Sequence, residues 1–212
     1  RLRCDWSSDV CSSDLTYTVQ DVMNSKKLTD DLKLLDCSRP CTGSASIILA
    51  TEELTKNITD NPVWITGIGQ KTTSASFTKN KSFTSMESTK LAAQSALKMS
   101  NHTANDIDVA EIHDAFSVCE PMALESLGFS DYGEGLDLVD ELYETNNFKI
   151  NPRGGLIGSG HPLGATGISQ TIEITQQLQS NANNRQVDDA NIGLIHNMSA
   201  AATSSTVLVL EK

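Results

Sequence analysis

The sequence contains no apolar run long enough to cross a membrane. Its longest apolar segments, such as residues 47–50 and 207–210, are short, whereas a membrane-spanning helix needs about 20 apolar residues. Basic residues are also scarce, because 16 Lys and Arg stand against 27 Asp and Glu and give a formal net charge of −11. Such a charge repels phosphate backbones and anionic membrane surfaces. The composition therefore predicts neither a membrane protein nor a nucleic-acid-binding protein.

A cysteine framework is also lacking once residues 1–15 are set aside. These residues carry two of the five cysteines and a repeated Ser-Ser-Asp, and they resemble the translation of a sequencing adapter. We interpret them as such an artefact or as a disordered tail, and infer the fold without them. The remaining cysteines, Cys37, Cys41 and Cys119, are odd in number, which favours a reducing compartment, the cytoplasm. We expect all three to be structural, since no second ligand pair has metal-binding spacing.

Strand and helix signals alternate along the rest of the chain. This alternation predicts an α/β layered fold. An Ala-rich helix is expected to start at a capping box over residues 84–87. The predicted elements are, in order, a helix over 21–33, a doubly buried strand over 45–50, a helix over 51–56, a strand over 63–70, a loop over 71–83, a helix to residue 100, a strand over 106–112, a helix over 114–127, an acidic insertion over 131–147, a glycine-rich turn over 154–167, a helix over 165–178, and strands over 192–195 and 206–210.

Three of the four histidines fall at predicted strand-to-loop junctions. His113 follows one strand, His196 follows another, and His161 lies inside the glycine-rich turn. His102 lies in a polar turn and is predicted to have no role in the site. In an open α/β sheet, such junctions meet at one edge, where ligands bind. Imidazoles move protons near neutral pH, so the three together could act as base, acid and hydrogen-bond donor. For any one of them, a partly buried histidine bonded to backbone remains the alternative.

The glycine-rich turn is the most informative segment of the sequence. Six glycines in fourteen residues allow the backbone to approach a ligand closely, and Pro162 stiffens the approach to the adjacent histidine. Amides at the start of the following helix could bind an anion or a developing oxyanion. The turn lacks the Lys-Ser/Thr ending of a phosphate-binding loop, and its glycine spacing does not fit a dinucleotide fingerprint.

Four blocks of the sequence are distinctive: EIHDAF at residues 111–116, NPRGGLIGSGHPLGATG at 151–167, His196-Asn197, and residues 34–37 with Gly43. Together they resemble the thiolase superfamily, and within it the sterol carrier protein x type and the archaeal acetyl-CoA acetyltransferases. The resemblance implies a thiolase-like α-β-α sandwich. It assigns residues 16–62 to the end of an N-terminal thiolase domain and residues 63–212 to the C-terminal thiolase domain.

The resemblance also implies roles for individual side chains. His161 would be the base that activates a cysteine nucleophile, His113 would help to form the thioester oxyanion site, and His196 stands where other thiolases carry a second cysteine that acts as acid and base. An adjacent imidazole raises the thiolate fraction of a thiol, so these roles are chemically reasonable. No cofactor is expected beyond the coenzyme A thioester that serves as substrate, and no metal. Predicted substrate contacts are Gly160, Pro162, Gly164, Phe116 and Asn197.

Two departures from the family pattern keep a second reading open. Thr42 replaces an aspartate before Gly43, and residues 199–202, Ser-Ala-Ala-Ala, replace a glycine-rich run. Added Cβ atoms there could narrow the approach of substrate or disfavour a positive-φ backbone. The leading hypothesis is a C-terminal fragment of a thiolase-type acyltransferase whose nucleophilic cysteine lies outside it. The alternative is a non-catalytic, thiolase-like protein that binds acyl-CoA or acts as a scaffold.

A third and least favoured hypothesis is a metal-dependent hydrolase using the three histidines. Their spacing offers no helical two-histidine motif, which argues against it. Family resemblance further implies a homodimer or homotetramer for the full-length protein, and a small zinc-ribbon/OB-fold protein as a possible partner. Without its N-terminal half, the fragment is expected to expose apolar surface and to associate or aggregate.

Overall fold

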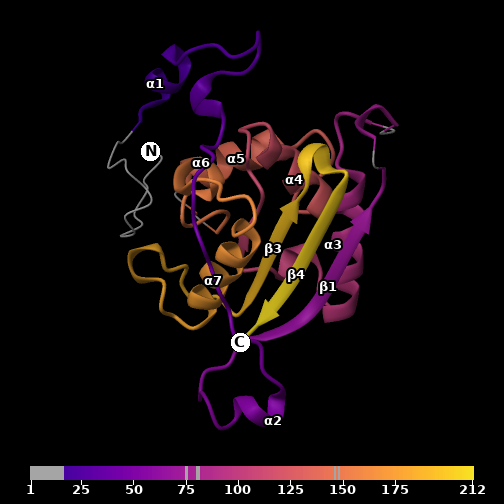
Figure 1. Cartoon of the computed structure of the whole chain (residues 1–212), viewed down its shortest axis with the longest axis vertical. Helices are drawn as coiled ribbons and strands as arrows, with labels where there is room; N and C mark the ends of the chain where they lie inside the picture. The colour runs from indigo at the N-terminus through magenta and orange to yellow at the C-terminus, as the bar shows by residue number, and fades with distance from the viewer. Residues whose placement is uncertain (1–16, 75, 80–81, 146, 148) are drawn as a thin grey trace.

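The computed structural model describes residues 17–74, 76–79, 82–145, 147 and 149–212, so the interpretation of residues 1–15 lies outside the described residues. One four-stranded sheet organises this part of the chain (Figure 1). Its strand order is β1 (Trp64–Thr72), β4 (Ser204–Glu211), β3 (Ile192–Met198) and β2 (Val109–Glu111). β2 and β3 run parallel, while β3 with β4 and β4 with β1 are antiparallel. The parallel pair ends on the same side, which places the segments after β2 and β3 near each other.

Helices cover both faces of the sheet. α3 (Glu87–Ser100) packs against β1 and β4, and α7 (Thr166–Leu178) packs against β2 and β3. Side chains alternate along a strand, so Val207 and Val209 join the cluster under α3, while Leu208 and Leu210 join the cluster under α7. The predicted α/β layered fold is confirmed.

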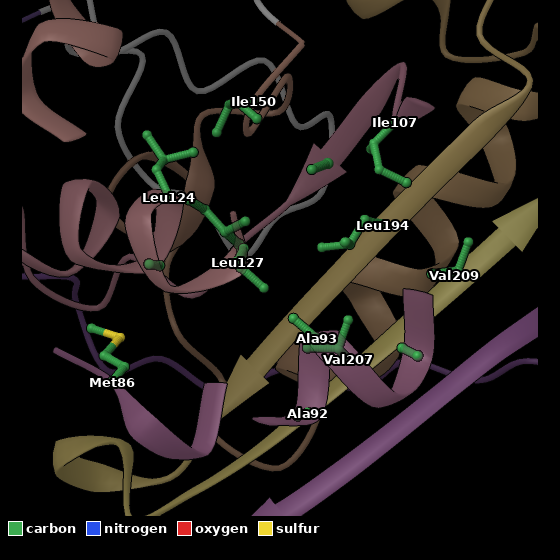
Figure 2. Packing of buried hydrophobic residues seen from close by; sticks show 14 of the residues in the cluster. Met86, Ala92, Ala93, Ile107, Leu124, Leu127, Ile150, Leu194, Val207 and Val209 are labelled. Atoms are coloured by element: carbon green, nitrogen blue, oxygen red, sulfur yellow. The ribbon is translucent and has the colours of Figure 1, made fainter. Parts of the chain in front are cut away.

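The larger cluster lies between the sheet and helices α3 and α4 (Cys119–Leu127), as Figure 2 shows. α3 approaches β1 closely because small residues meet there: a Cβ on Gly67 or Gly69 would overlap the backbone of Ala96 or Ala92. The Ala-rich sequence of the helix and the Gly-x-Gly of the strand therefore match each other. The remaining elements are α1 (Val19–Asn24), α2 (Glu52–Thr55), α5 (Gly135–Glu144), α6 (Gly155–Ser159) and the 3-10 turns Leu34–Asp36, Phe77–Lys79, Ala104–Asp106, Asn183–Arg185 and Ala200–Ala202.

The prediction of a doubly buried strand over residues 45–50 is wrong. The segment has no regular structure, and Ile48 and Leu49 are 93% and 71% exposed. Their apolar character indicates burial, but no neighbouring strand pairs with them within the described residues. In Figure 1 this segment belongs to the long connection that runs from α1 down the molecule to α2.

Several element boundaries also differ from the prediction. The helix expected over residues 21–33 ends at Asn24, and the strand expected over 106–112 shortens to Val109–Glu111. The capping box at residues 84–87 does not form, because Thr84 Oγ1 bonds the hydroxyl of Tyr132 and α3 starts after Met86. The acidic insertion contains α5, and the loop predicted over 71–83 includes the end of β1 and a 3-10 turn. No helix of the described chain is long and apolar enough to span a membrane.

Candidate functional site

Two of the predicted catalytic histidines are in direct contact. The ring centroids of His113 and His161 lie 5.0 Å apart, with the planes at 88° in an edge-to-face arrangement. His113 follows β2. His161 does not follow a strand, which corrects the prediction: it comes after the short helix α6 and forms an isolated bridge with Pro40. The backbone N–H of His161 donates to the carbonyl of Arg39 at 2.9 Å.

His196 lies within β3 rather than after it, because that strand extends to Met198. Its ring is fully buried on the face of the sheet that α3 covers, and its Nε2 lies 3.1 Å from Thr89 Oγ1. His113 contributes to lowering the pKa of His196, whereas the ring contact among the histidines is that of His113 with His161. His102 makes a separate contact, in which its Nε2 pairs with Glu211 Oε1 at 2.9 Å.

Burial favours the neutral form of all three imidazoles. Burial lowers the pKa of His113 to about 4 and that of His196 to about 3; His161 adds to the shift of His113, and His113 adds to the shift of His196. Burial also lowers the pKa of His161, which is partly exposed. Neutral imidazoles can accept a proton at neutral pH, so these rings suit base catalysis and hydrogen bonding rather than binding of an anion by charge.

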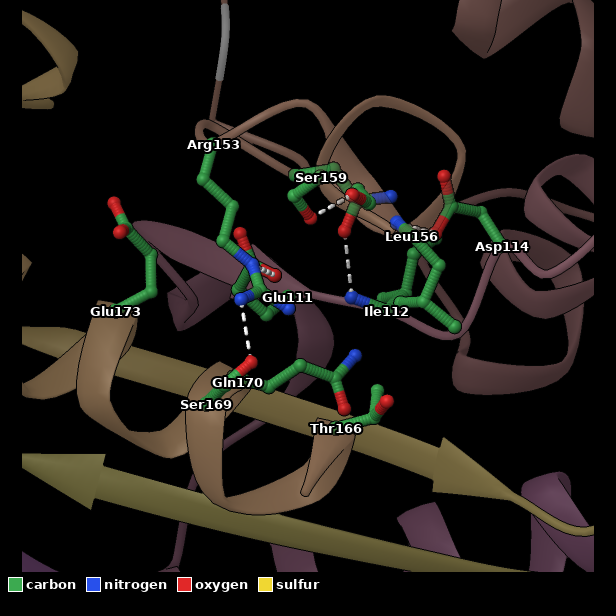
Figure 3. Close-up of polar contacts among 12 residues, drawn as sticks. Glu111, Ile112, Asp114, Arg153, Leu156, Ser159, Thr166, Ser169, Gln170 and Glu173 are labelled. Carbon is green, nitrogen blue, oxygen red and sulfur yellow. Dashed lines mark hydrogen bonds and ion pairs between the residues drawn. The ribbon is translucent and has the colours of Figure 1, made fainter. Parts of the chain in front are cut away.

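Buried polar contacts tie the end of β2 and the residue after it to residues 151–169 (Figure 3). Arg153 Nε donates to Glu111 Oε2 at 2.8 Å, and its Nη1 donates to Ser169 Oγ at 2.5 Å. The N–H of Ile112 donates to Asn151 Oδ1 at 2.8 Å. Because these contacts flank His113, they fix its backbone.

Asp114 extends this connection to α6. Its carboxylate accepts the N–H of Leu156 at 2.6 Å and that of Ile157 at 3.5 Å. Gly155 is required there, since its φ is 62° and a Cβ would overlap the carboxylate. The carboxylate is therefore committed to α6, which explains why the helix predicted from residue 114 starts only at Cys119.

Burial dominates the protonation of the carboxyl groups in this layer. It raises the pKa of Glu111 to about 7, against the opposing effect of Arg153, and raises the pKa of Asp114 to about 7 despite the amides that it accepts. Burial also raises the pKa of Glu120 to about 7. At neutral pH a fraction of each of these three groups is therefore protonated.

A segment that sequence reasoning treated only as the end of a domain crosses both histidine loops. The N–H of Ser38 donates to the carbonyl of Ala115 at 2.8 Å, and the N–H of Ser117 donates to the carbonyl of Asp36 at 2.8 Å. One step further along the chain, the Arg39 carbonyl accepts from the His161 loop. Residues 36–41 therefore connect the loops that carry His113 and His161. In the sequence, residues 34–37 and Gly43 stood out only by their resemblance to a family block, which does not reveal this connection.

An apolar cavity of about 410 Å³ opens beside His113. Phe116, predicted as a substrate contact, lines it and is 44% exposed. Residues 199–202, which follow β3, also line it. The main apolar lining residues are Phe83, Met86, Phe116, Val118, Met122 and Met198.

The other predicted substrate contacts are dispersed. Gly160 packs against Cys41 Sγ, and Pro162 packs against Gly43, so both lie where residues 36–43 cross the turn. Asn197 points to the α7 face, opposite to its neighbour in β3, and its Nδ2 donates to Gln170 Oε1 at 2.9 Å. Gly164 is exposed at the start of α7. The binding roles of these residues remain predictions.

The described residues contain no group of three or more His, Cys, Asp or Glu side chains that could hold a metal ion. Cys37, Cys41 and Cys119 are unbridged thiols. Burial raises the pKa of Cys37 and of Cys119, so neither thiol is activated. Within this part of the chain, the chemistry offered is therefore that of the imidazoles.

Comparison with known proteins agrees with the motifs. A sequence model of the thiolase C-terminal domain-like family matches residues 69–212. The chain belongs to the thiolase family. It is 38% identical over 200 residues to an acetyl-CoA acetyltransferase of Methanothermobacter thermautotrophicus, which covers 93% of this chain and 52% of that protein. It is 40% identical over 189 residues to human sterol carrier protein 2, which covers 86% of this chain and 35% of that protein.

Solved structures show the same fold. The Ltp2-ChsH2(DUF35) aldolase superposes with a TM-score of 0.79 at 20% identity, covering 92% of this chain and 51% of that one. The Bacillus anthracis acetyl-CoA acetyltransferase gives a TM-score of 0.66 at 19% identity, covering 92% and 42%. This thiolase-family chain thus spans about half the length, or less, of the relatives that it matches.

Proposed function

We propose that this thiolase-family chain forms the histidine half of an acyltransferase site that makes or cleaves a 3-oxoacyl thioester of coenzyme A. The observation that carries the proposal is the contact between His113 and His161, two neutral imidazoles beside an apolar cavity. One side chain can withdraw a proton from a thiol while the other donates a hydrogen bond to the thioester oxygen. Acyl transfer through a cysteine needs both actions at one place.

The contacts of each ring favour a division of roles. His161 Nδ1 is held by Thr166 Oγ1 at 2.8 Å, so its Nε2 is the nitrogen presented to a thiol. In the proposed step, that nitrogen takes the S–H proton, the sulfur forms a bond to the thioester carbonyl carbon, and the carbonyl electrons move to oxygen. His113 would then stabilise the oxyanion.

The nucleophile of this reaction is proposed to come from a protein segment outside these 212 residues. The relatives' greater length is consistent with that proposal. For the whole protein we further propose a cytoplasmic homodimer or homotetramer that takes acyl-CoA as substrate. A small zinc-ribbon/OB-fold protein remains a proposed partner.

The test is thiolysis of acetoacetyl-CoA by a protein expressed from the upstream coding sequence together with the sequence of this chain, which we call the joined protein. The proposal predicts coenzyme A-dependent formation of acetyl-CoA and an acyl group on one upstream cysteine, detectable by mass spectrometry. An upstream sequence without a cysteine after a strand, or an intact protein without turnover, contradicts it.

One observation favours the alternative of a non-catalytic acyl-CoA-binding or scaffold protein. Ala201 and Ala202, which replace family glycines beside the cavity, have φ values of 55° and 49°. Alanine is strained in this left-handed region, and its methyl group takes space that glycine leaves to a ligand. Tight binding of acetyl-CoA without thiolysis, by the same joined protein, would support this alternative.

A further inference from the structure

Three buried hydroxyls connect His196 to the backbone beside the apolar cavity. We call Ser88, Ser205 and Thr89 the hydroxyl chain. Ser88 Oγ lies 2.6 Å from the carbonyl oxygen of Ala202 and 2.7 Å from Ser205 Oγ. Thr89 Oγ1 lies 2.9 Å from Ser205 Oγ and 3.1 Å from His196 Nε2. All of these residues are buried, so the hydroxyls have one another as partners rather than water.

The direction of every hydrogen bond in the chain follows from counting protons. A carbonyl oxygen can only accept, so the Ser88 hydroxyl donates its one hydrogen to the carbonyl oxygen of Ala202. Its contact with Ser205 must then use the proton of Ser205. The contact between Ser205 and Thr89 must in turn use the proton of Thr89.

The last contact has one possible donor left. Thr89 has no proton for His196, so the Nε2 of His196 must carry the hydrogen and donate it to Thr89 Oγ1. A neutral imidazole has a single N–H, which makes the other ring nitrogen a lone-pair acceptor. That atom, Nδ1, is buried and has no hydrogen-bond partner among the described residues.

We infer that the hydroxyl chain fixes His196 as the Nε2–H tautomer and thereby presents Nδ1 as an unoccupied proton acceptor. Its members are positioning residues, since they act on a ligand only through His196. The inference rests on the proposed function for its purpose: His161 takes the proton of the nucleophilic cysteine, whereas a bare Nδ1 lets His196 take the proton of the coenzyme A thiol in the thiolysis direction. The S–H bond breaks, the proton forms a bond to Nδ1, and the electron pair stays on sulfur.

The chain also links the ring to the strained alanines. The acceptor that sets the direction of all four bonds is the carbonyl of Ala202, a residue with positive φ. A different conformation of residues 199–202 would remove that acceptor and free the Ser88 proton. The loop that borders the cavity therefore controls which nitrogen of His196 carries hydrogen.

The tautomer can be read directly from the ¹⁵N signals of the histidine ring in the 212-residue chain. We expect Nε2 to give a protonated-type signal and Nδ1 an unprotonated-type signal throughout pH 5 to 8. The opposite pattern in the wild-type chain overturns the inference, even if every variant fails to fold. This readout needs no acyl transfer, so it can fail while thiolysis succeeds, and it can succeed while thiolysis fails.

Ser88→Ala tests the direction of the chain at a residue that does not touch the ring. Without Ser88, Ser205 can turn its proton to Thr89, and Thr89 can turn its own to Nε2. We expect the ratio of Nε2–H to Nδ1–H tautomers to fall roughly tenfold, the effect of about one hydrogen bond. Thr89→Val should also lower the ratio, whereas Thr89→Ser, which keeps the hydroxyl, should leave the ratio at its wild-type value.

Ser95→Ala is the matched control, because Ser95 lies on the same helix but donates to the Leu91 carbonyl, outside the chain. It should leave the tautomer ratio unchanged. A folded Ser88→Ala chain with the wild-type ratio, or a Ser95→Ala chain with an equal change, contradicts the inference.

Discussion

The imidazoles of His113 and His161 differ from ordinary histidines because their contacts favour the neutral form. Desolvation lowers the pKa of both, and for His113 the neighbouring ring of His161 adds to the shift. A surface histidine would be largely charged at pH 5.5, whereas His113 should stay neutral to about pH 4. His113 can therefore act as a neutral hydrogen-bond donor in mildly acidic as well as neutral conditions.

This difference predicts a pH dependence of stability. Between pH 6.5 and about 4, the unfolded chain binds a proton at residue 113 and the folded chain does not, so His113 lowers the free energy of unfolding as the pH falls. His113→Asn removes that term. Urea unfolding at several pH values should show the wild type losing stability relative to the variant as the pH drops from 7 to 4. A constant difference between them would contradict the lowered pKa.

At Ala201 the strain itself can be measured. Ala201→Gly should raise the free energy of unfolding by about 1 kcal/mol, because glycine adopts φ near 55° without the Cβ clash. The side chain is exposed, so little packing is lost. Ala200→Gly, one position earlier and outside the positive-φ residues, should instead lower stability slightly. Equal effects of the two changes in urea unfolding would refute the strain.

At the scale of elements, the ion pair between Glu111 and Arg153 joins β2 to the segment that leads into α6. The two side chains are 0% and 4% exposed, so neither charge is compensated by water. Arg153→Leu should lower the free energy of unfolding by about 3–5 kcal/mol, because it leaves the buried carboxyl group of Glu111 without its partner. Arg185→Leu, which breaks the more exposed pair with Glu173, should cost less. Thermal unfolding of both variants checks this order.

Sequence patterns predicted elements where local and tertiary preferences agree. The helix ending at Ser100, the helix ending at Leu178 and the strand starting at Trp64 each formed, since their apolar periodicity matches the face they bury. Patterns failed where a side chain serves a distant partner. Asp114 holds α6 instead of capping its own helix, and no sequence signal reveals a contact across forty residues.

The residues of the candidate site also fall into two classes, those that the sequence could predict and those that it could not. Its histidines could be found from the sequence because motif and residue chemistry point to the same side chains. The supporting residues, such as Thr89 and Arg153, could not be found, because their roles depend on which face of a helix meets which strand. The available sequence signal for Thr89 was a polar residue within an Ala-rich helix.

Across the whole molecule, the unusual feature is exposed apolar surface around residues 47–65. A groove of about 710 Å³ there is lined by residues from this segment, β1 and α7. Ile47, Ile48 and Leu49 border it, and the last two are largely exposed. Soluble monomers rarely expose such patches, so the chain is expected to self-associate.

Light scattering over a range of concentrations tests this expectation. The mean mass should rise with concentration, and the double variant Ile48→Lys, Leu49→Lys should shift the rise to higher concentration. Val19→Lys is the control, because Val19 is 73% exposed on α1, away from the groove. A wild-type chain that stays monomeric at every concentration would contradict the expectation.

The most direct measurement of the central claim is the rate of acetoacetyl-CoA thiolysis by the joined protein carrying His161→Asn. We predict that kcat/KM falls by about 10²–10⁴-fold, which is the usual contribution of a positioned general base to the rate. His102→Asn, at the histidine paired with Glu211, should keep the wild-type rate. A His161→Asn protein with the wild-type kcat/KM would contradict the account.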